Sequence, residues 1–343
     1  MQQITTIIPT YRRPIFLRRA IKSALEQKNV TLQVCVYDNC SEDETEKVVR
    51  DLAKEDERIF YYCHSKNIGG LANFLYGMSE VETEFFSFLS DDDYLLPGFY
   101  QHAIAALDNY PEAMCWAGMT LNVDEDNLIW DARVRQWPRE GVFEPPEGFM
   151  AMTGGMAPLW TGILFRKDVL KKVGLIDPKI LGPSDLEYCL RLAARYPYIL
   201  EKYPAAVLTL NSQSYSATQP MTAFWPGWKY MFEKISSDPD LSAAFKHAAL
   251  AALRRDGRKM LFRRGANAVA AGRLDFVRDA ANALAGDCDE AARAFLLRSL
   301  AVGCSRSSDF QRIYTLAYRW AERRIVDSRQ DLQTAYGHLL QPI

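Results

Sequence analysis

Three consecutive aspartates, Asp91, Asp92 and Asp93, follow an apolar run in the stretch "FFSFLSDDDYLLPG". Carboxylates this close together repel one another and raise each other's pKa unless a cation or a hydrogen-bond network compensates them. Mg²⁺ and Mn²⁺ prefer oxygen ligands, usually take one or two protein carboxylates, and fill their other positions with phosphates and water. The cluster therefore predicts a divalent-cation site. The alternative is a turn in which one aspartate caps the following helix.

A second candidate carboxylate is Asp185, in the stretch "GPSDLEYCLRLA". The apolar spacing of this stretch predicts a helix that begins near Ser184, with Asp185 in its first turn. Asp185 would then point toward the mouth of a crevice. The alternative interpretation is that it only caps the start of the helix.

The elements that must position these carboxylates are predicted by residues 1–60, where extended and helical patterns alternate. The strand patterns "QITTIIPTY" and "LQVCVYDN" are each followed by a helix pattern, "PIFLRRAIKSALEQ" and "ETEKVVRDLAKE". This order predicts an α/β fold with a mainly parallel, Rossmann-like sheet flanked by helices. In such sheets ligands bind beyond the carboxyl ends of the strands, where Pro9, Asp38 and the aspartate cluster all lie. We therefore expect one crevice to collect all three.

The last third of the chain has a different character from about residue 226. Ala, Leu and Arg recur there at helical spacing, which predicts a helical region. Residues 226–343 contain 19 Lys and Arg against 13 Asp and Glu, whereas the chain as a whole has a net charge of −2. We therefore predict two domains, a catalytic α/β domain over residues 1–225 and a helical C-terminal domain over residues 226–343.

The overall composition excludes several classes of protein. A net charge of −2 with 24% charged residues argues against a general nucleic-acid binder. Seven cysteines without a CxxC pair and only four histidines argue against a zinc site or a disulfide framework. No long apolar window and no signal-peptide pattern is present, so we expect a protein that is cytoplasmic or peripheral at the inner face of the membrane.

Five segments occur in the order and at the spacing typical of family 2 glycosyltransferases, and residues 1–215 resemble that family. The segments are "TTIIPTYRRPIFLRRAIKSALEQ", "VYDNCSEDET", "NIGGLANF", "FLSDDDYLLPGF" and "GPSDLEYCLRLA". The resemblance implies a GT-A fold and a nucleotide-sugar donor. It also implies Mn²⁺ or Mg²⁺ held by a DxD-type motif and inversion at the anomeric carbon.

The resemblance also implies which residues bind the nucleotide: Pro9, Thr10, Tyr11, Asp38, Asn39, Asn67, Gly70, Asn73 and Asp91. Asp38 and Asn39 match the pair that meets the base and ribose. A carboxylate that accepts a hydrogen bond from the base is a specificity device, because its loss leaves buried polar groups unpaired. A turn that caps the next helix is an equally good explanation of Asn39 and a poorer one of Asp38.

For the metal, the resemblance implies Asp92 as the main ligand, with Asp91 and Asp93 beside it. Ser90 stands where many members of the family have the first aspartate of the motif. Some members have Ser or Thr at that position. The departure is therefore compatible with the motif.

For catalysis, the resemblance implies that Asp185 takes the proton from the acceptor hydroxyl as a general base. Ser184 replaces the glutamate that usually precedes this aspartate, which affects the expected contacts to sugar rather than the base itself. Glu187 is the next candidate for the base. The family's late histidine at the metal or diphosphate has no counterpart, and Asn211 or Ser214 would have to take its place.

The expected partners are a nucleotide-sugar, most simply a UDP-sugar, and a saccharide, lipid-linked or protein acceptor. The QxxRW signature of processive synthases is absent, so we expect one sugar to be added per encounter. Six basic residues crowd the stretch "LRRDGRKMLFRRG", namely Arg254, Arg255, Arg258, Lys259, Arg263 and Arg264. They form a solvated helix face or contact an anionic membrane surface.

The sequence thus predicts an inverting, metal-dependent glycosyltransferase, with a role in surface polysaccharide or glycoconjugate assembly implied only by the family. One alternative is a non-catalytic nucleotide- or sugar-binding protein on the same fold. Another is a sugar nucleotidyltransferase, although "IPTYRRP" lacks the glycine-rich loop that such an enzyme needs after its first strand.

Overall fold

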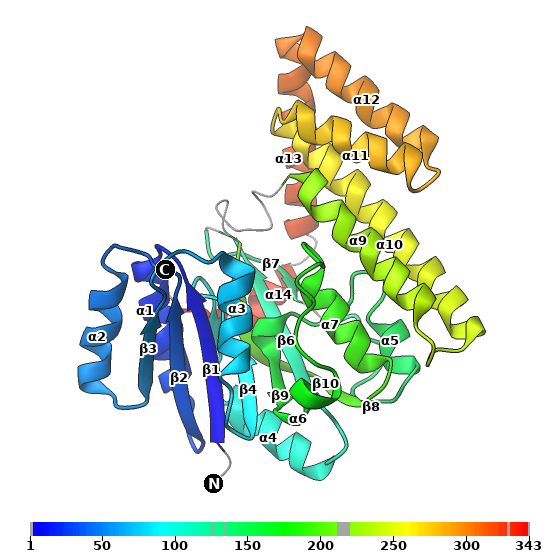
Figure 1. Cartoon of the computed structure of the whole chain (residues 1–343). Coiled ribbons are helices and arrows are strands. Elements are labelled where there is room, and N and C mark those ends of the chain that lie inside the picture. The colour runs from blue at the N-terminus through cyan, green and yellow to red at the C-terminus, as the bar shows by residue number, and fades with distance from the viewer. Residues whose placement is uncertain (1–2, 125, 133–134, 211–219, 328–329, 342–343) are drawn as a thin grey trace.

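The computed structural model describes residues 3–124, 126–132, 135–210, 220–327 and 330–341. Its centre is a ten-stranded sheet in the order β3-β2-β1-β4-β9-β6-β10-β5, with β7 paired to β6 and β8 paired to β10. The predicted α/β fold with a mainly parallel sheet flanked by helices is confirmed, and helices cover both faces of the sheet (Figure 1).

The first half of the sheet is parallel and follows the alternating pattern of the sequence. Its strands are β1 (Gln3–Thr10), β2 (Thr31–Asp38), β3 (Ile59–Cys63) and β4 (Phe85–Phe88), and its helices are α1 (Pro14–Leu25), α2 (Thr45–Glu55) and α3 (Gly70–Ser79). Ile4 and Ile8 of β1 pack on the face covered by α1, whereas Ile7 belongs to the core on the other face. The carboxyl ends of β1, β2 and β4 therefore meet at one edge of the sheet.

The second half of the sheet is mixed. Its strands are β5 (Tyr94–Leu95), β6 (Cys115–Val123), β7 (Ile129–Ala132), β8 (Gly141–Phe143), β9 (Ile163–Arg166) and β10 (Tyr198–Thr209). Short helices lie between them: α4 (Phe99–Asn109), α5 (Glu147–Ala151), η1 (Trp160–Gly162), α6 (Asp168–Lys172) and α7 (Ser184–Ala193). β9 runs antiparallel to both β4 and β6, so it joins the two halves into one sheet.

The helical region begins with α9 (Met221–Ser237), slightly before the predicted boundary at residue 226. It continues through α10 (Ala243–Ala270), α11 (Leu274–Gly286), α12 (Ala291–Arg306) and α13 (Ser308–Asp327). These helices form a bundle that extends beyond the edge of the sheet at which β1 ends (Figure 1). Among the described residues, no helix is both long and apolar enough to cross a lipid bilayer.

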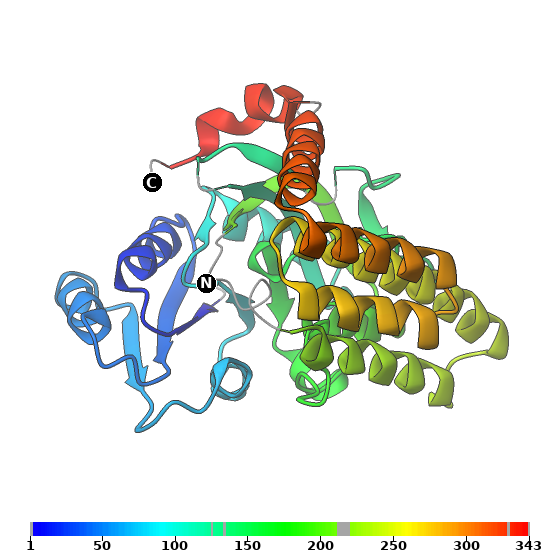
Figure 2. The same cartoon turned by 90° about the horizontal axis from the view of Figure 1, so that it is seen from above.

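The final helix does not stay with that bundle. Seen from above, α14 (Gln330–Tyr336) lies apart from α10–α12, back against the sheet, and is followed by η2 (Gly337–Leu339) (Figure 2). The Ile129 amide of β7 donates to Gln333 Oε1 at 2.9 Å, and the Gln341 amide donates to the Tyr94 hydroxyl at 3.1 Å. The C-terminal segment therefore packs on the α/β region, and the predicted division at residues 225 and 226 stays a prediction.

Candidate active site

A cavity of ≈ 670 Å³ opens at the carboxyl ends of β1 and β4. It is lined by almost all the residues that the sequence predicts for the site, namely Pro9, Thr10, Tyr11, Asn39, Asn67, Gly70, Asn73, Asp91, Asp92, Asp93 and Asp185. Asp38 is the one member of the predicted set that does not line it. Two segments separated by more than ninety positions, around Asp92 and Asp185, therefore share one cavity.

Arg13 supplies the positive charge beside the aspartate cluster. Its Nη1 lies 3.2 Å from Asp91 Oδ1 and 2.7 Å from Asp92 Oδ2. Arg13 directly precedes Pro14, the first residue of α1, and the fixed φ of proline suits that position. The start of α1 therefore holds a guanidinium between two carboxylates at the end of β4. No local sequence pattern points to Arg13, because its partners are 78 and 79 positions away.

Asp91 is held by the last residue of β1 and by the residue after it. Its Oδ2 accepts hydrogen bonds from Thr10 Oγ1 at 2.8 Å and from the Tyr11 amide at 3.4 Å. Burial, followed by the charge of Asp92, raises the pKa of Asp91 to about 6, although Arg13 acts in the opposite direction. Arg13 therefore does not fully compensate the burial and the negative charge of the aspartate cluster.

Asp93 faces a different set of donors. Thr161 Oγ1 donates to its Oδ2 at 2.7 Å, and the Thr209 amide donates to its Oδ1 at 3.0 Å. Burial raises the pKa of Asp93 above its usual range. Because both oxygens already link η1 and β10, this geometry favours a structural role over the predicted metal contact.

Asn39 and Asn67 organise the loop before α3. Asn39 accepts a hydrogen bond from the Ile68 amide at 2.8 Å and donates to Asn67 Oδ1 at 3.0 Å. Asn73 in α3 donates to the Tyr37 carbonyl at 2.8 Å and pairs with His64 Nε2 at 3.0 Å. These amides therefore shape the wall of the cavity as well as lining it.

Asp38 is buried behind that wall, with 2% of its surface exposed. Its Oδ1 accepts from the Ser41 hydroxyl at 2.6 Å and from the Ser41 amide at 2.9 Å. Its Oδ2 accepts from the Tyr61 hydroxyl at 2.7 Å. Both oxygens are therefore used in fixing the loop that presents Asn39, and a direct contact of Asp38 with a base stays a prediction.

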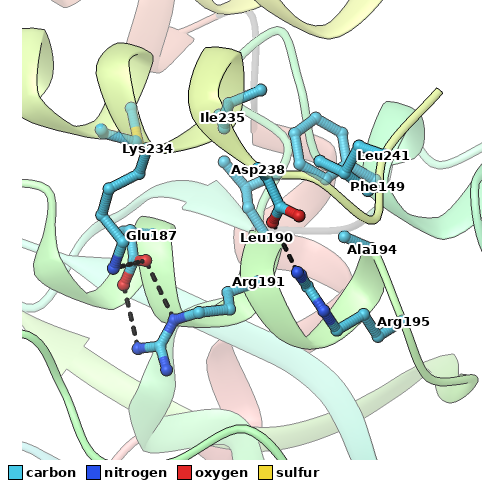
Figure 3. A pocket seen from close by; sticks show the side chains of 11 residues that line it. Phe149, Glu187, Leu190, Arg191, Ala194, Arg195, Lys234, Ile235, Asp238 and Leu241 are labelled. Carbon is cyan, nitrogen blue, oxygen red and sulfur yellow. Dashed lines mark hydrogen bonds and ion pairs between the residues drawn. The ribbon is translucent and has the colours of Figure 1, made fainter. Parts of the chain in front are cut away.

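Asp185 is exposed in the first turn of α7, as its spacing predicts. Trp160, whose ring also lines the cavity, donates from Nε1 to the Asp185 carbonyl at 3.2 Å. Glu187 behaves differently, because it is buried and bonded to Arg191 Nε at 2.9 Å and Lys234 Nζ at 2.8 Å (Figure 3). It does not line the cavity, so its place as the next candidate for the base is wrong.

The family model described as "Glycosyl transferase family 2" matches residues 5–174 of the chain. The chain carries a family 2 glycosyltransferase domain. That domain contains β1 to β9 and the aspartate cluster, while Asp185 lies just beyond the matched residues.

Curated relatives of the transferase domain match parts of the chain. A GalNAc(5)-diNAcBac-PP-undecaprenol beta-1,3-glucosyltransferase of Campylobacter jejuni is 38% identical over 99 residues, which are 29% of this chain and 32% of the relative. An uncharacterized glycosyltransferase of Rickettsia typhi is 32% identical over 188 residues, which are 54% of this chain and 56% of the relative. The chain thus spans between about a third and just over half of these two relatives.

Solved structures match over nearly the whole length. Staphylococcus aureus TarS 1–349 in complex with UDP-GlcNAc has a TM-score of 0.62 at 16% identity, with 93% of this chain and 92% of that chain covered. The mannosyltransferase PcManGT from Pyrobaculum calidifontis, in complex with GDP-Man and Mn²⁺, has a TM-score of 0.50 at 16% identity, with 95% and 86% covered. At this identity the likeness concerns the fold, and it confirms the predicted GT-A fold followed by a helical region.

The donor set of the transferase domain fits a divalent cation that is completed by other ligands. Within the described ranges, no group of three or more His, Cys, Asp or Glu side chains could hold a metal ion. Mg²⁺ and Mn²⁺ need only one or two protein carboxylates, and Asp91 and Asp92 offer these at the cavity wall. The Arg13 guanidinium between them indicates that the site accepts positive charge. Asn211 and Ser214, the predicted substitutes for the histidine, lie outside the described residues.

Proposed function

We propose that the protein transfers a single sugar from a nucleotide-sugar, most simply a UDP-sugar, to a hydroxyl acceptor, with inversion and with Mn²⁺ or Mg²⁺. The observation that carries this proposal is the single cavity shared by Asp91, Asp92 and Asp185 in a chain with a family 2 domain. The cavity is large enough for a nucleotide-sugar, since ligand pockets commonly span about 300–1,000 Å³.

In this proposal the nucleoside lies against the end of β1 and the loop before α3. The cavity offers Thr10 at the end of β1, Tyr11 directly after it, and Asn39 and Asn67 from the neighbouring loops. The diphosphate lies toward Asp91 and Asp92. A divalent cation held by these two carboxylates would act as a Lewis acid that stabilises the negative charge developing on the departing diphosphate.

Asp185 acts on the acceptor hydroxyl, whose oxygen attacks the anomeric carbon of the sugar. Inversion by single displacement requires the acceptor oxygen to approach opposite the leaving diphosphate and to lose its proton as the new bond forms. Asp185 is exposed at the cavity wall, so its carboxylate can accept that proton as a general base. Trp160, bonded to the Asp185 carbonyl, holds the first turn of α7 in place.

The acceptor class that we propose to test first is a polyprenyl-diphosphate-linked glycan. The support comes from the Campylobacter relative, whose name describes such an acceptor. Saccharide and protein acceptors are the other classes expected from the sequence.

The test measures nucleoside diphosphate released from a panel of UDP-sugars and GDP-mannose, with Mn²⁺ and with EDTA. We expect at least one donor to be turned over only when the metal is present, and Asp185→Asn to slow that turnover. Metal-dependent binding without any release, with every acceptor class, would instead support the non-catalytic alternative. Absence of both binding and release would contradict the proposal.

A further inference from the structure

Exposed apolar side chains concentrate on α12 and α13. The described part of the chain has 17 large apolar residues with exposed side chains, and seven of them lie within residues 291–327. They are Phe295, Leu296, Val302, Phe310, Ile313, Leu316 and Trp320, with exposed fractions between 41% and 71%. Scattered exposed apolar residues are ordinary, but a concentration of this kind marks an interaction surface.

On α13 these residues form one continuous stripe. Phe310, Ile313, Leu316 and Trp320 follow one another at intervals of three or four positions, which places them on one side of a helix. The other side packs on α10. There Tyr314 donates to the Ala266 carbonyl at 3.2 Å.

The stripe on α13 is joined to α12 at the turn between the two helices. A Cβ at Gly303 would lie 2.7 Å from the Phe310 ring, so the two helices touch there. On α12, Phe295 and Val302 are seven positions apart and both exposed, while Ala294 and Leu297 are buried. The apolar surface therefore spans both helices, and its residues are solvent-exposed in the described chain.

The charge of this surface indicates the kind of partner. Residues 291–327 contain seven arginines against three acidic residues. Arg312, Arg319 and Arg323 are exposed and line one flank of the α13 stripe. The Arg324 guanidinium lies over the Trp320 ring at 4.9 Å. An apolar stripe with Trp, Phe and Leu beside arginines is typical of helices that lie in the interface of an anionic membrane.

A second copy of this chain fits the same surface less well. Two such faces packed together would bring their arginine flanks close to each other, and like charges at an interface are unfavourable. An anionic surface compensates the arginines and accepts the apolar side chains at the same time.

The predicted basic segment of α10 is a poorer candidate for this contact. Its apolar companions Leu253 and Leu261 are fully buried. Arg258 lies 3.3 Å from Glu290, and the Arg264 guanidinium lies over the Phe224 ring at 4.3 Å. The apolar side of this stretch therefore packs inside the helical region, while Arg254, Arg255, Lys259 and Arg263 are exposed.

We propose that α12 and α13 dock the protein on an anionic lipid surface. Ile313, Leu316 and Trp320 enter the boundary between headgroups and acyl chains, and the arginines contact the headgroups. The bundle rises beyond the same edge of the sheet at which the cavity opens (Figure 1). The proposal includes that the docked protein holds this edge toward the membrane. Access to a lipid-linked acceptor would follow from this position only if the proposed transfer reaction holds; the docking itself does not depend on it.

The test uses the full chain with vesicles of phosphatidylcholine, alone or mixed with phosphatidylglycerol, in a flotation assay. We expect binding to the anionic vesicles only, weakened by salt because surface charges are screened. Trp320→Glu and Ile313→Glu should each weaken binding by about tenfold or more. Each removes an apolar side chain that enters the membrane and adds a negative charge that the anionic lipids repel. Tyr110→Glu is the matched control, since Tyr110 is 49% exposed at the end of α4, outside the bundle, and should bind as the parent does.

Thermal melting of each variant checks that it folds, which is expected because the substituted side chains are exposed. The proposal is overturned if the parent does not bind anionic vesicles, or if all variants bind equally. It is also overturned if ultracentrifugation shows a dimer that Trp320→Glu abolishes, because a second copy would then cover the face. None of these measurements involves sugar transfer, so failure of the proposed reaction would leave this test intact.

Discussion

At the scale of single residues, the aspartate cluster is compensated unequally. Arg13 bridges Asp91 and Asp92, whereas Asp93 relies on Thr161 and the backbone of β10. Of the two carboxylates beside Arg13, the one closer to the guanidinium is the more informative to substitute. That residue is Asp92, whose Oδ2 lies 2.7 Å from Arg13.

Asp92→Ala should abolish the effect of Mn²⁺ on UDP binding and leave the fold intact, because one of three adjacent carboxylates is removed. Calorimetric titration of UDP with and without Mn²⁺ measures this. Asp51→Ala is the control, since it removes an equal charge from the exposed surface of α2. Unchanged Mn²⁺ dependence in Asp92→Ala would refute the metal assignment.

Asp185→Asn should lower the rate of transfer by about 10²–10⁴-fold, which is the usual contribution of a general base. Donor binding should hardly change, because Asn keeps the size of the side chain. Asp168→Asn provides the control, because Asp168 occupies the first turn of α6 and does not line the cavity. A near-parental rate for Asp185→Asn would move the base to another residue of the cavity.

Asp91 should make stability depend on pH in metal-free buffer. Its pKa is raised to about 6 in the folded protein, from about 3.9 in an unfolded chain. The folded state then binds more protons between these values, so the free energy of unfolding falls as pH rises from about 4 to about 6, by about 2–3 kcal/mol. Urea unfolding of the parent and Asp91→Asn across that range measures the difference. Equal slopes in the two proteins would show that Asp91 is not the group responsible.

At the scale of elements, α9 forms a support behind the wall of the cavity that carries Asp185. Leu181 and Gly182 line the cavity, and a Cβ at Gly227 of α9 would collide with the Leu181 carbonyl. Lys234 of the same helix lies 2.8 Å from Glu187 (Figure 3). It also lies 3.1 Å from Asp177. The first helix of the helical region thus fixes both the loop before α7 and α7 itself.

Gly227→Ala should therefore displace that wall and destabilise the protein by about 1–3 kcal/mol, as overpacking does in a close-packed interior. The KM for the acceptor should rise more than the affinity for UDP falls. Gly286→Ala is the matched control, since a Cβ at this helical glycine meets nothing within 4 Å. Thermal melting and acceptor titration give both readouts, and identical behaviour of the two variants would contradict the support role.

Local patterns in the sequence predicted these elements well, because strand and helix periodicity and turn residues are short-range signals. The parallel pairing of the first strands and the residues at their ends followed from the same signals. The contacts of Arg13 with Asp92, and of Gln341 with Tyr94, did not, since they join positions 79 and 247 residues apart. The burial of Asp38 beneath Tyr61 likewise depends on how β2 and β3 pack.

At the scale of the whole molecule, the helical region is attached to the sheet at both of its ends. α9 packs on α7 and the loop before it, and α14 packs on β7. Between them, α10–α13 project from the sheet as a bundle (Figure 1).

We expect the two regions to unfold together in one transition, because separating them would break the contacts of α9 and α14 at once. Circular dichroism at the helix band and tryptophan fluorescence should give the same melting temperature. UDP with Mn²⁺ should raise both by an equal amount, since a ligand of the folded state stabilises the whole cooperative unit. Two separate transitions would show that the helical region folds on its own.

The return of the C-terminal segment to the sheet has a practical consequence for protein engineering. Gln341 donates to Tyr94, the Arg19 guanidinium lies over the Tyr94 ring at 4.6 Å, and Arg19 Nη2 donates to the Asp92 carbonyl at 2.7 Å. A purification tag fused behind Gln341 would therefore pull on a segment that is linked to Asp92 through Tyr94 and Arg19. β1 begins at the opposite edge of the sheet (Figure 1). An affinity handle or a surface-immobilisation linker belongs at that end of the chain.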